Sequence, residues 1–99
     1  ESMINHVVLL NWHEGVSDNT IDTVTAGFAK LVNSISEIKH YSFGANMNLA
    51  GSNYEYALVA QFDTIDDFNN YVIHPKHQHF MDTVTSPIVK SYGAVQYTT

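Results

Sequence analysis

The first third of the chain changes from a strand pattern of apolar residues to a helical one. Residues 3–12, MINHVVLLNW, are rich in β-branched and aliphatic side chains and predict a first strand. Both alternating sets of side chains are mostly apolar, so we expect this strand to be covered on both faces. After a turn at Gly15, apolar residues recur at helical spacing over residues 18–33 and predict an amphipathic helix, with Ser17 or Asp18 as N-cap.

The remaining pattern predicts three more strands and two more helices. We expect, in order, a strand at residues 38–47, a turn at 48–53, a strand at 54–62, a short helix at 65–71, a helix from Pro75 to about residue 84, and a last strand at 89–97.

This β-α-β-β-α-β order is the ferredoxin-like arrangement of the α+β class, an antiparallel sheet with helices on one face. The helices leave the other face bare, and that face carries Val7, Leu9, Ala57 and Val59. A bare apolar surface of this size predicts association. We therefore expect a homodimer through the bare sheet face, in which two sheets form a dimeric α/β barrel.

Chain length predicts a single domain, placed at residues 3–97, because 99 residues are too few for two domains. Residues 1–2 precede Met3 and are expected to be a remnant of an expression tag. No apolar run reaches the roughly 20 residues that span a bilayer, so no membrane partner is expected. Cysteine is absent, which excludes disulfides and thiolate chemistry, and a cytoplasmic location is the expectation.

The charge balance excludes further classes of partner. The formal net charge is −6, from ten acidic residues against four lysines, with no arginine. Nucleic acid is therefore not expected as a partner, because it requires a clustered basic surface. Phosphate and carboxylate substrates held by bidentate guanidinium groups are not expected either, because the chain has no arginine.

Three of the six histidines lie in residues 71–80, YVIHPKHQHF. His74, His77 and His79 have an H-x-x-H-x-H spacing, but Pro75 places the first outside the helix. The third lies about 160° around the helix from the second. Three ligands from this run converge poorly, so no metal is expected, and the run is first of all a helix junction.

Acid–base chemistry is the alternative use of these residues. His6 lies in an apolar strand, and if its face turns toward the helices it lies near Tyr56. Tyr71 and His77 would then reach over the same gap, and a neutral imidazole beside a phenol can transfer protons near pH 7. A core His6 with one partner, and a Tyr71 whose hydroxyl is at the surface, fit the pattern as well.

Several stretches together resemble the stress-responsive dimeric α/β-barrel domain family, called Dabb, over residues 3–97. They are HVVLL at 6–10, EGVS at 14–17, FD at 62–63, NYVIHPKH at 70–77, and a final strand that ends near Tyr97.

The resemblance implies a ferredoxin-like protomer and a homodimer with a central barrel. One type in this family, the plant olivetolic acid cyclase, closes a linear polyketide thioester by aldol condensation in a pocket between sheet and helices. Its proton-transferring tyrosine and histidine match Tyr71 and His77, and its first-strand histidine and helix aromatic match His6 and Phe28. The cyclase has a histidine where this chain has Tyr56, which is a poor base at pH 7.

Three functions are left open. The first is a stress-responsive protein that binds a small apolar or aromatic ligand against His6, Phe28, Tyr56 and Leu58. The second is a cofactor-free cyclase or lyase with His77 as general base and Tyr71 as donor to a carbonyl. The third is a dimeric-barrel monooxygenase, whose haem branch is disfavoured because no arginine is present to hold propionates. No cofactor is expected.

Overall fold

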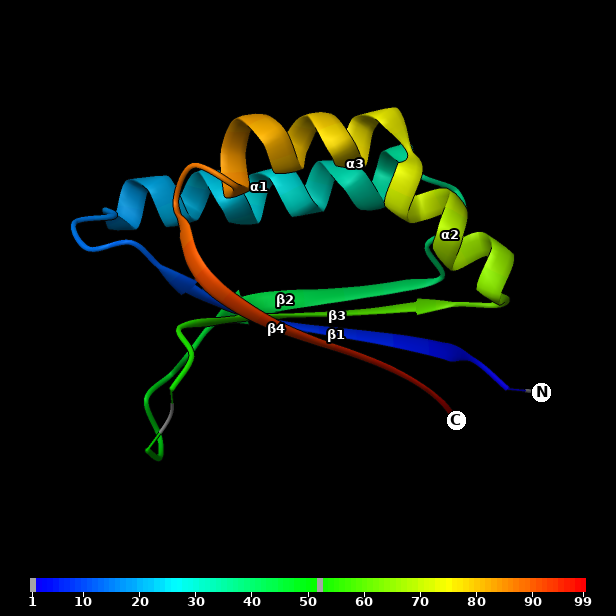
Figure 1. Ribbon diagram of the computed structural model, residues 1–99, viewed down its shortest axis with the longest axis horizontal. Helices are drawn as coiled ribbons and strands as arrows, with labels where there is room; N and C mark the ends of the chain where they lie inside the picture. Colours follow the sequence, from blue (N-terminus) through cyan, green and yellow to red (C-terminus); the bar gives the residue numbers. More distant parts are fainter. Residues whose placement is uncertain (1, 52) are drawn as a thin grey trace.

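One antiparallel sheet is covered on one face by helices in the computed structural model, which describes residues 2–51 and 53–99 (Figure 1). Its elements are β1 (Ile4–Trp12), α1 (Asp18–Ser34), β2 (His40–Ala45), β3 (Tyr56–Phe62), α2 (Ile65–Ile73), α3 (Pro75–Phe80), the π-helical segment η1 (Met81–Thr85) and β4 (Val89–Thr98). Glu1 of the expected tag remnant and Ser52 of the expected turn lie outside the described residues.

The four strands have the order β2-β3-β1-β4, and every neighbouring pair is antiparallel. The expected ferredoxin-like fold is therefore confirmed. β2 is two residues shorter than predicted at each end, and β3 begins two residues later than predicted but ends at Phe62 as expected. The connection between the two strands is therefore wider than a tight hairpin. Asn46 closes it by donating its backbone N–H to Glu55 O and its side-chain amide to Tyr54 O, both at 2.9 Å.

Local capping explains where the helices begin. The Ser17 hydroxyl accepts from Thr20 N at 3.2 Å at the start of α1, and Thr64 does the same for Asp67 N at 3.0 Å at the start of α2. The apolar stripe of α1 then packs on the sheet. Its buried members are Val24, Phe28 and Leu31.

The junction at Pro75 forms as predicted, but the helix after it changes type. His74 ends α2 and caps α3, where its Nδ1 accepts from Lys76 N at 3.1 Å. The expected α-helix up to residue 84 is wrong beyond Phe80. Ser86 N bonds the carbonyl of Met81 at 2.8 Å, five residues back, so this last turn is a π-turn.

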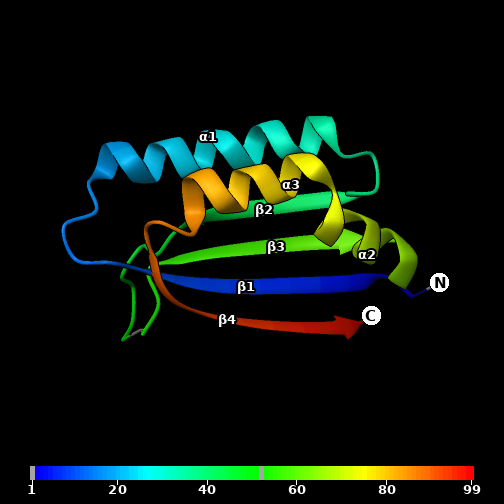
Figure 2. The same cartoon turned by 45° about the horizontal axis from the view of Figure 1, so that its top comes forward.

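The two faces of the sheet differ as the pattern predicted. Leu10 and Trp12 of β1 and Tyr56 and Leu58 of β3 belong to the buried core under the helices. Figure 2 shows α1 and α3 on this side of the sheet, with β4 at one edge. The opposite face has no covering element in the described protomer. In the same part of the chain, no helix is long and apolar enough to cross a membrane.

Candidate functional site

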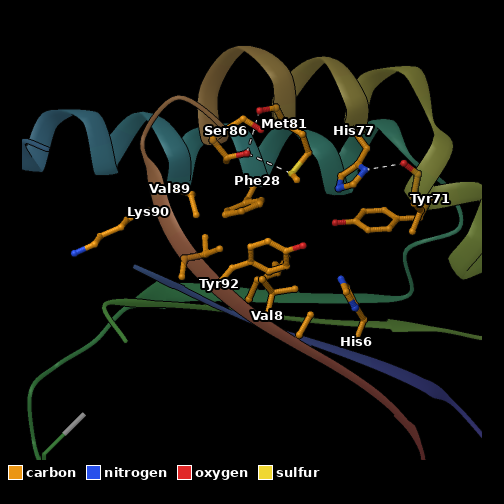
Figure 3. A pocket seen from close by; sticks show the side chains of 15 residues that line it. His6, Val8, Phe28, Tyr71, His77, Met81, Ser86, Val89, Lys90 and Tyr92 are labelled. Carbon is orange, nitrogen blue, oxygen red and sulfur yellow. Dashed lines mark hydrogen bonds between the residues drawn. The ribbon is translucent and has the colours of Figure 1, made fainter. Parts of the chain in front are cut away.

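A cavity of about 480 Å³ lies between the sheet and the α3–η1 segment, bounded on its open side by the edge strand β4. Five of the six predicted site residues line it. They are His6, Phe28, Leu58, Tyr71 and His77. Figure 3 shows His6 on the sheet below, Phe28 on α1 behind, and Tyr71 and His77 on either side of the junction between α2 and α3.

Tyr56 is the predicted site residue that lies away from the cavity. It is only 1% exposed, and its hydroxyl oxygen lies 2.7 Å from the hydroxyl of Thr25 on α1. Its ring packs against Trp12 and Phe28. Burial raises the pKa of its phenol. Tyr56 therefore lies in the core, and the expectation that it meets the two histidines in one pocket is not met.

His77 reaches the cavity because α2 ends just before it. The Val72 carbonyl in the last turn of α2 accepts a hydrogen bond from His77 Nδ1 at 3.0 Å. A carbonyl can only accept, so the neutral ring has its proton on Nδ1 and a free lone pair on Nε2. Burial lowers the pKa of His77 against the opposing effect of the Val72 bond, and nearby His74 lowers it further. The ring is therefore a neutral acceptor near pH 7.

Tyr71 lies directly beside His77, with 4.3 Å between the ring centroids. Its hydroxyl oxygen is 2.7 Å from the hydroxyl of Tyr41 on β2. Burial raises the pKa of Tyr71 to about 12, and the bond to Tyr41 opposes that rise because it would stabilise the phenolate. When Tyr41 donates to Tyr71, the Tyr71 proton is free for a ligand, and each bond polarises the next.

His6 lies on the sheet below Tyr71 and His77 and forms the floor of this end of the cavity. Its ring lies 6.2 Å from that of Tyr71 and 5.0 Å from that of Phe68. The amide nitrogen of Gln96 on β4 is 2.9 Å from Nδ1. Burial lowers the pKa of His6 to about 4, with a further contribution from His77, so the ring is neutral at pH 7.

Sequence reasoning missed the contributions of β2, η1 and β4. Tyr41, Met81, Thr85, Tyr92 and Gln96 all contact the cavity or the polar groups in its wall. The available signal was alternation along the strands. Residues 92, 94 and 96 pair with 10, 8 and 6 of β1 and so lie on the same face as His6, but this requires the strand register.

The other histidines have separate places. His74 caps α3, and His13, His40 and His79 are exposed. Within residues 2–51 and 53–99, no three histidine, aspartate or glutamate side chains gather closely enough to hold a metal ion.

The polar end of the cavity combines groups that donate and accept protons. Nε2 of His77 and the hydroxyl of Tyr71 face the cavity (Figure 3). The rest of its wall is mostly apolar and includes Val8, Leu58 and Ala94. This arrangement can bind one polar group of a mostly apolar molecule. It can also move a proton between that molecule and His77.

Comparison with known proteins gives a consistent assignment. The family model described as Stress responsive A/B Barrel Domain (Dabb) matches residues 4–99. A curated relative, the stress-response A/B barrel domain-containing protein HS1 of Arabidopsis thaliana, is 28% identical over 79 residues, covering 78% of this chain and 72% of its own.

Solved structures resemble the chain over nearly its whole length. A dimeric ferredoxin-like protein of unknown function from Thermobifida fusca is 34% identical with a TM-score of 0.88, covering 97% of this chain and 90% of its own. The hydroxynitrile lyase from Passiflora edulis shares the fold at 20% identity and a TM-score of 0.87, covering 98% and 93%.

Proposed function

The chain belongs to the stress responsive A/B barrel domain family, and we propose that it binds a small apolar or aromatic molecule carrying one carbonyl or hydroxyl group. The observation that carries this proposal is the cavity between sheet and helices. It is apolar along its length and ends at two neutral histidines and a buried tyrosine.

The size and lining of the cavity favour a small molecule. A volume of about 480 Å³ lies within the usual range for ligand pockets. Phe28 and Leu58 offer aromatic and aliphatic surface to a ring or an alkyl chain. No arginine is present, and the one cation in the wall, Lys90, points away from the cavity in Figure 3. The ligand is therefore expected to be uncharged.

The proposal includes a homodimer through the bare sheet face. Val7 and Val59 lie side by side on that face, and Val95 and Tyr97 of β4 extend it at 55% and 51% exposure. Burial of such a face is favourable in proportion to its apolar area. A similar solved structure is described as dimeric. The cavity opens on the opposite side of the sheet, so both cavities stay accessible.

An NMR titration tests ligand binding. Acetophenone, phenol and ethylbenzene are added separately to labelled protein, and signals of the cavity residues are followed. We expect acetophenone and phenol to shift His77 and Tyr71 in a saturable way. Ala94→Phe should abolish these shifts because the new ring fills the cavity from β4. Ala29→Phe adds the same ring on the exposed side of α1 and should leave them unchanged. Equal shifts in both variants would exclude this cavity as the binding site.

A second candidate function is proton transfer, in a cofactor-free enzyme of the lyase or aldol type. Its basis is the free Nε2 of His77 beside the Tyr71 hydroxyl. His77 would take a proton from the carbon next to a carbonyl, while Tyr71 donates a hydrogen bond to the oxygen where negative charge develops. The hydroxynitrile lyase shows that the same fold accommodates an enzyme.

Hydrogen–deuterium exchange tests this second function. The methyl protons of acetophenone exchange in D₂O when a base removes them reversibly. We expect the protein to accelerate this exchange, and His77→Gln to reduce the rate at least tenfold, within the usual contribution of a general base. Replacement of the exposed His79 is the control. Exchange at the background rate with the wild-type protein would leave binding alone as the function.

A further inference from the structure

We propose that Gln96 is a positioning residue that fixes the proton of His6 on Nε2, so that His6 donates into the cavity while His77 accepts. The two histidines then have opposite tautomers, each set by a different neighbour. The role of these protons in recognising a ligand rests on the proposed function, but their positions on the two rings can be measured without any ligand.

The bond to Gln96 determines the tautomer of His6. The Gln96 amide nitrogen lies 2.9 Å from Nδ1. An amide NH₂ group can only donate, so Nδ1 must accept and have no proton. The ring is neutral, so its single proton is on Nε2. Figure 3 shows this far ring nitrogen directed toward the rings of Tyr71 and His77.

The pairing of β1 with β4 independently places Gln96 for this task. His6 and Gln96 are directly opposite in the antiparallel register, so their side chains are neighbours on one sheet face. In the described part of the chain, Gln96 is the one hydrogen-bond partner that the His6 side chain has. The strand pairing that builds the cavity edge thus also orients the histidine in its floor.

His77 has the opposite arrangement. Its Nδ1 donates to the Val72 carbonyl at 3.0 Å, which leaves Nε2 as an acceptor. A donor on His6 and an acceptor on His77 complement each other at neutral pH. If Nε2 of His77 were a donor as well, this ring would have protons on both nitrogens and be charged, which the buried site disfavours.

This arrangement specifies the ligand more narrowly than the shape of the cavity does. A carbonyl oxygen has two lone pairs and can accept from His6 Nε2–H and from the Tyr71 hydroxyl together. An acidic C–H or O–H on the neighbouring atom would then face Nε2 of His77. The site therefore selects neutral molecules with an acceptor oxygen next to such a hydrogen.

Nitrogen NMR of the histidine rings tests the assignment directly. Protein labelled with ¹⁵N at histidine is measured without ligand at about pH 8, where both rings are neutral; protonated and unprotonated ring nitrogens are well separated in such spectra. In the wild type we expect the proton on Nε2 of His6 and on Nδ1 of His77. Gln96→Glu presents only acceptors to Nδ1 and should move the His6 proton to Nδ1, with His77 unchanged.

The chain offers a matched control at Gln61. That glutamine lies on the neighbouring strand β3 and donates to Asn5 on the bare face of the sheet at 2.7 Å. Gln61→Glu adds the same charge without touching His6, and we expect it to leave the His6 tautomer unchanged. Gln96→Leu is a further variant that removes the donor without supplying a new acceptor. It should populate both tautomers of His6, and circular dichroism verifies that each variant is folded.

Ligand preference supplies the second arm. Wild-type protein should bind acetophenone more tightly than ethylbenzene, which lacks the oxygen. Gln96→Glu should reduce that preference about fivefold, the value of one lost hydrogen bond. A wild-type His6 with its proton on Nδ1 would overturn the inference. The expected tautomers without binding of either probe would support the role of Gln96 and count against the proposed function.

Discussion

At the scale of single residues, the site is defined by where its protons are. Three polar side chains lie at one end of the cavity, and each forms a hydrogen bond within the protein. Tyr71 pairs with Tyr41, His6 with Gln96, and His77 with the Val72 carbonyl. The chain pattern made these three side chains candidates and the family resemblance gave Tyr71 and His77 their expected roles, but the pattern alone left open whether the three converge. It did not select Tyr41 and Gln96, because a strand residue acquires its partner from the register of pairing, which no local pattern contains.

The hydroxyl pair of Tyr41 and Tyr71 should show strong energetic coupling. Replacing either tyrosine by phenylalanine leaves the other hydroxyl without its partner and should lower the free energy of unfolding by about 1–2 kcal/mol. The double variant should lose less than the sum, with a coupling of about 0.5–1.5 kcal/mol. Urea denaturation of the four proteins measures these values. Additive losses would mean that the 2.7 Å contact contributes nothing to stability.

Stability should depend on pH through His6. Its pKa is lowered to about 4 by burial, from an ordinary value of 6.5 in the unfolded chain. Between these values the unfolded state binds more protons, so the free energy of unfolding falls as pH drops from about 6.5 to 4. The slope for one group is at most about 1.4 kcal/mol per pH unit.

Urea titrations at several pH values measure this slope. We expect His6→Gln to flatten it, while His77 contributes a smaller slope of the same sign because its pKa is also lowered. Replacement of His13, which lies outside the cavity, is the control. An unchanged slope in His6→Gln would show that His6 is solvated in the folded protein.

At the scale of elements, the position of the α3–η1 segment decides whether the cavity exists. Gly27 of α1 allows the Phe80 ring to lie against its backbone, and a Cβ there would collide with that ring. The sequence predicted the helix start at Pro75 correctly. The π-turn that follows was not predicted, because the segment Met81–Thr85 is too short for its apolar residues to show a period different from that of an α-helix.

Gly27→Ala should therefore destabilise the protein, although the same change in an exposed helix is stabilising. We expect a loss of about 1–3 kcal/mol from overpacking, and NMR shifts of His77 because α3 moves with Phe80. Gly51→Ala, at a site with nothing within 4 Å, is the control. Adding Phe80→Leu should recover part of the loss. A stabilised Gly27→Ala variant would contradict the close packing of α1 on α3.

At the scale of the whole molecule, the sheet divides two roles between its faces. The alternation of side chains along the strands predicted which residues lie on each face. One alternate set packs under the helices, and the other set lies on the bare face of the sheet. The element order predicted the ferredoxin-like arrangement, and the observed antiparallel sheet with the strand order β2-β3-β1-β4 confirms it. The cavity was harder to predict, because hollow and filled parts of one interior have the same apolar composition.

The bare face offers a direct test of the proposed dimer. Val59→Asp places a charge in the middle of this face and should shift the protein from dimer to monomer, because an unpaired charge cannot be buried there. Sedimentation equilibrium or light scattering measures the mass. Ile73→Asp, on a side chain that is 67% exposed on α2, should leave the mass unchanged. A Val59→Asp variant that remains dimeric would place the interface elsewhere.

The edge position of β4 also has a consequence for how such a protein can diversify. The strand forms a wall of the cavity, yet its residues are mostly exposed and contribute little to the buried core. Substitutions at residues 92 and 94 can therefore alter what the cavity accepts while folding is maintained by α1 and the inner strands. A mutant library confined to these positions would sample new ligand preferences with few unfolded members.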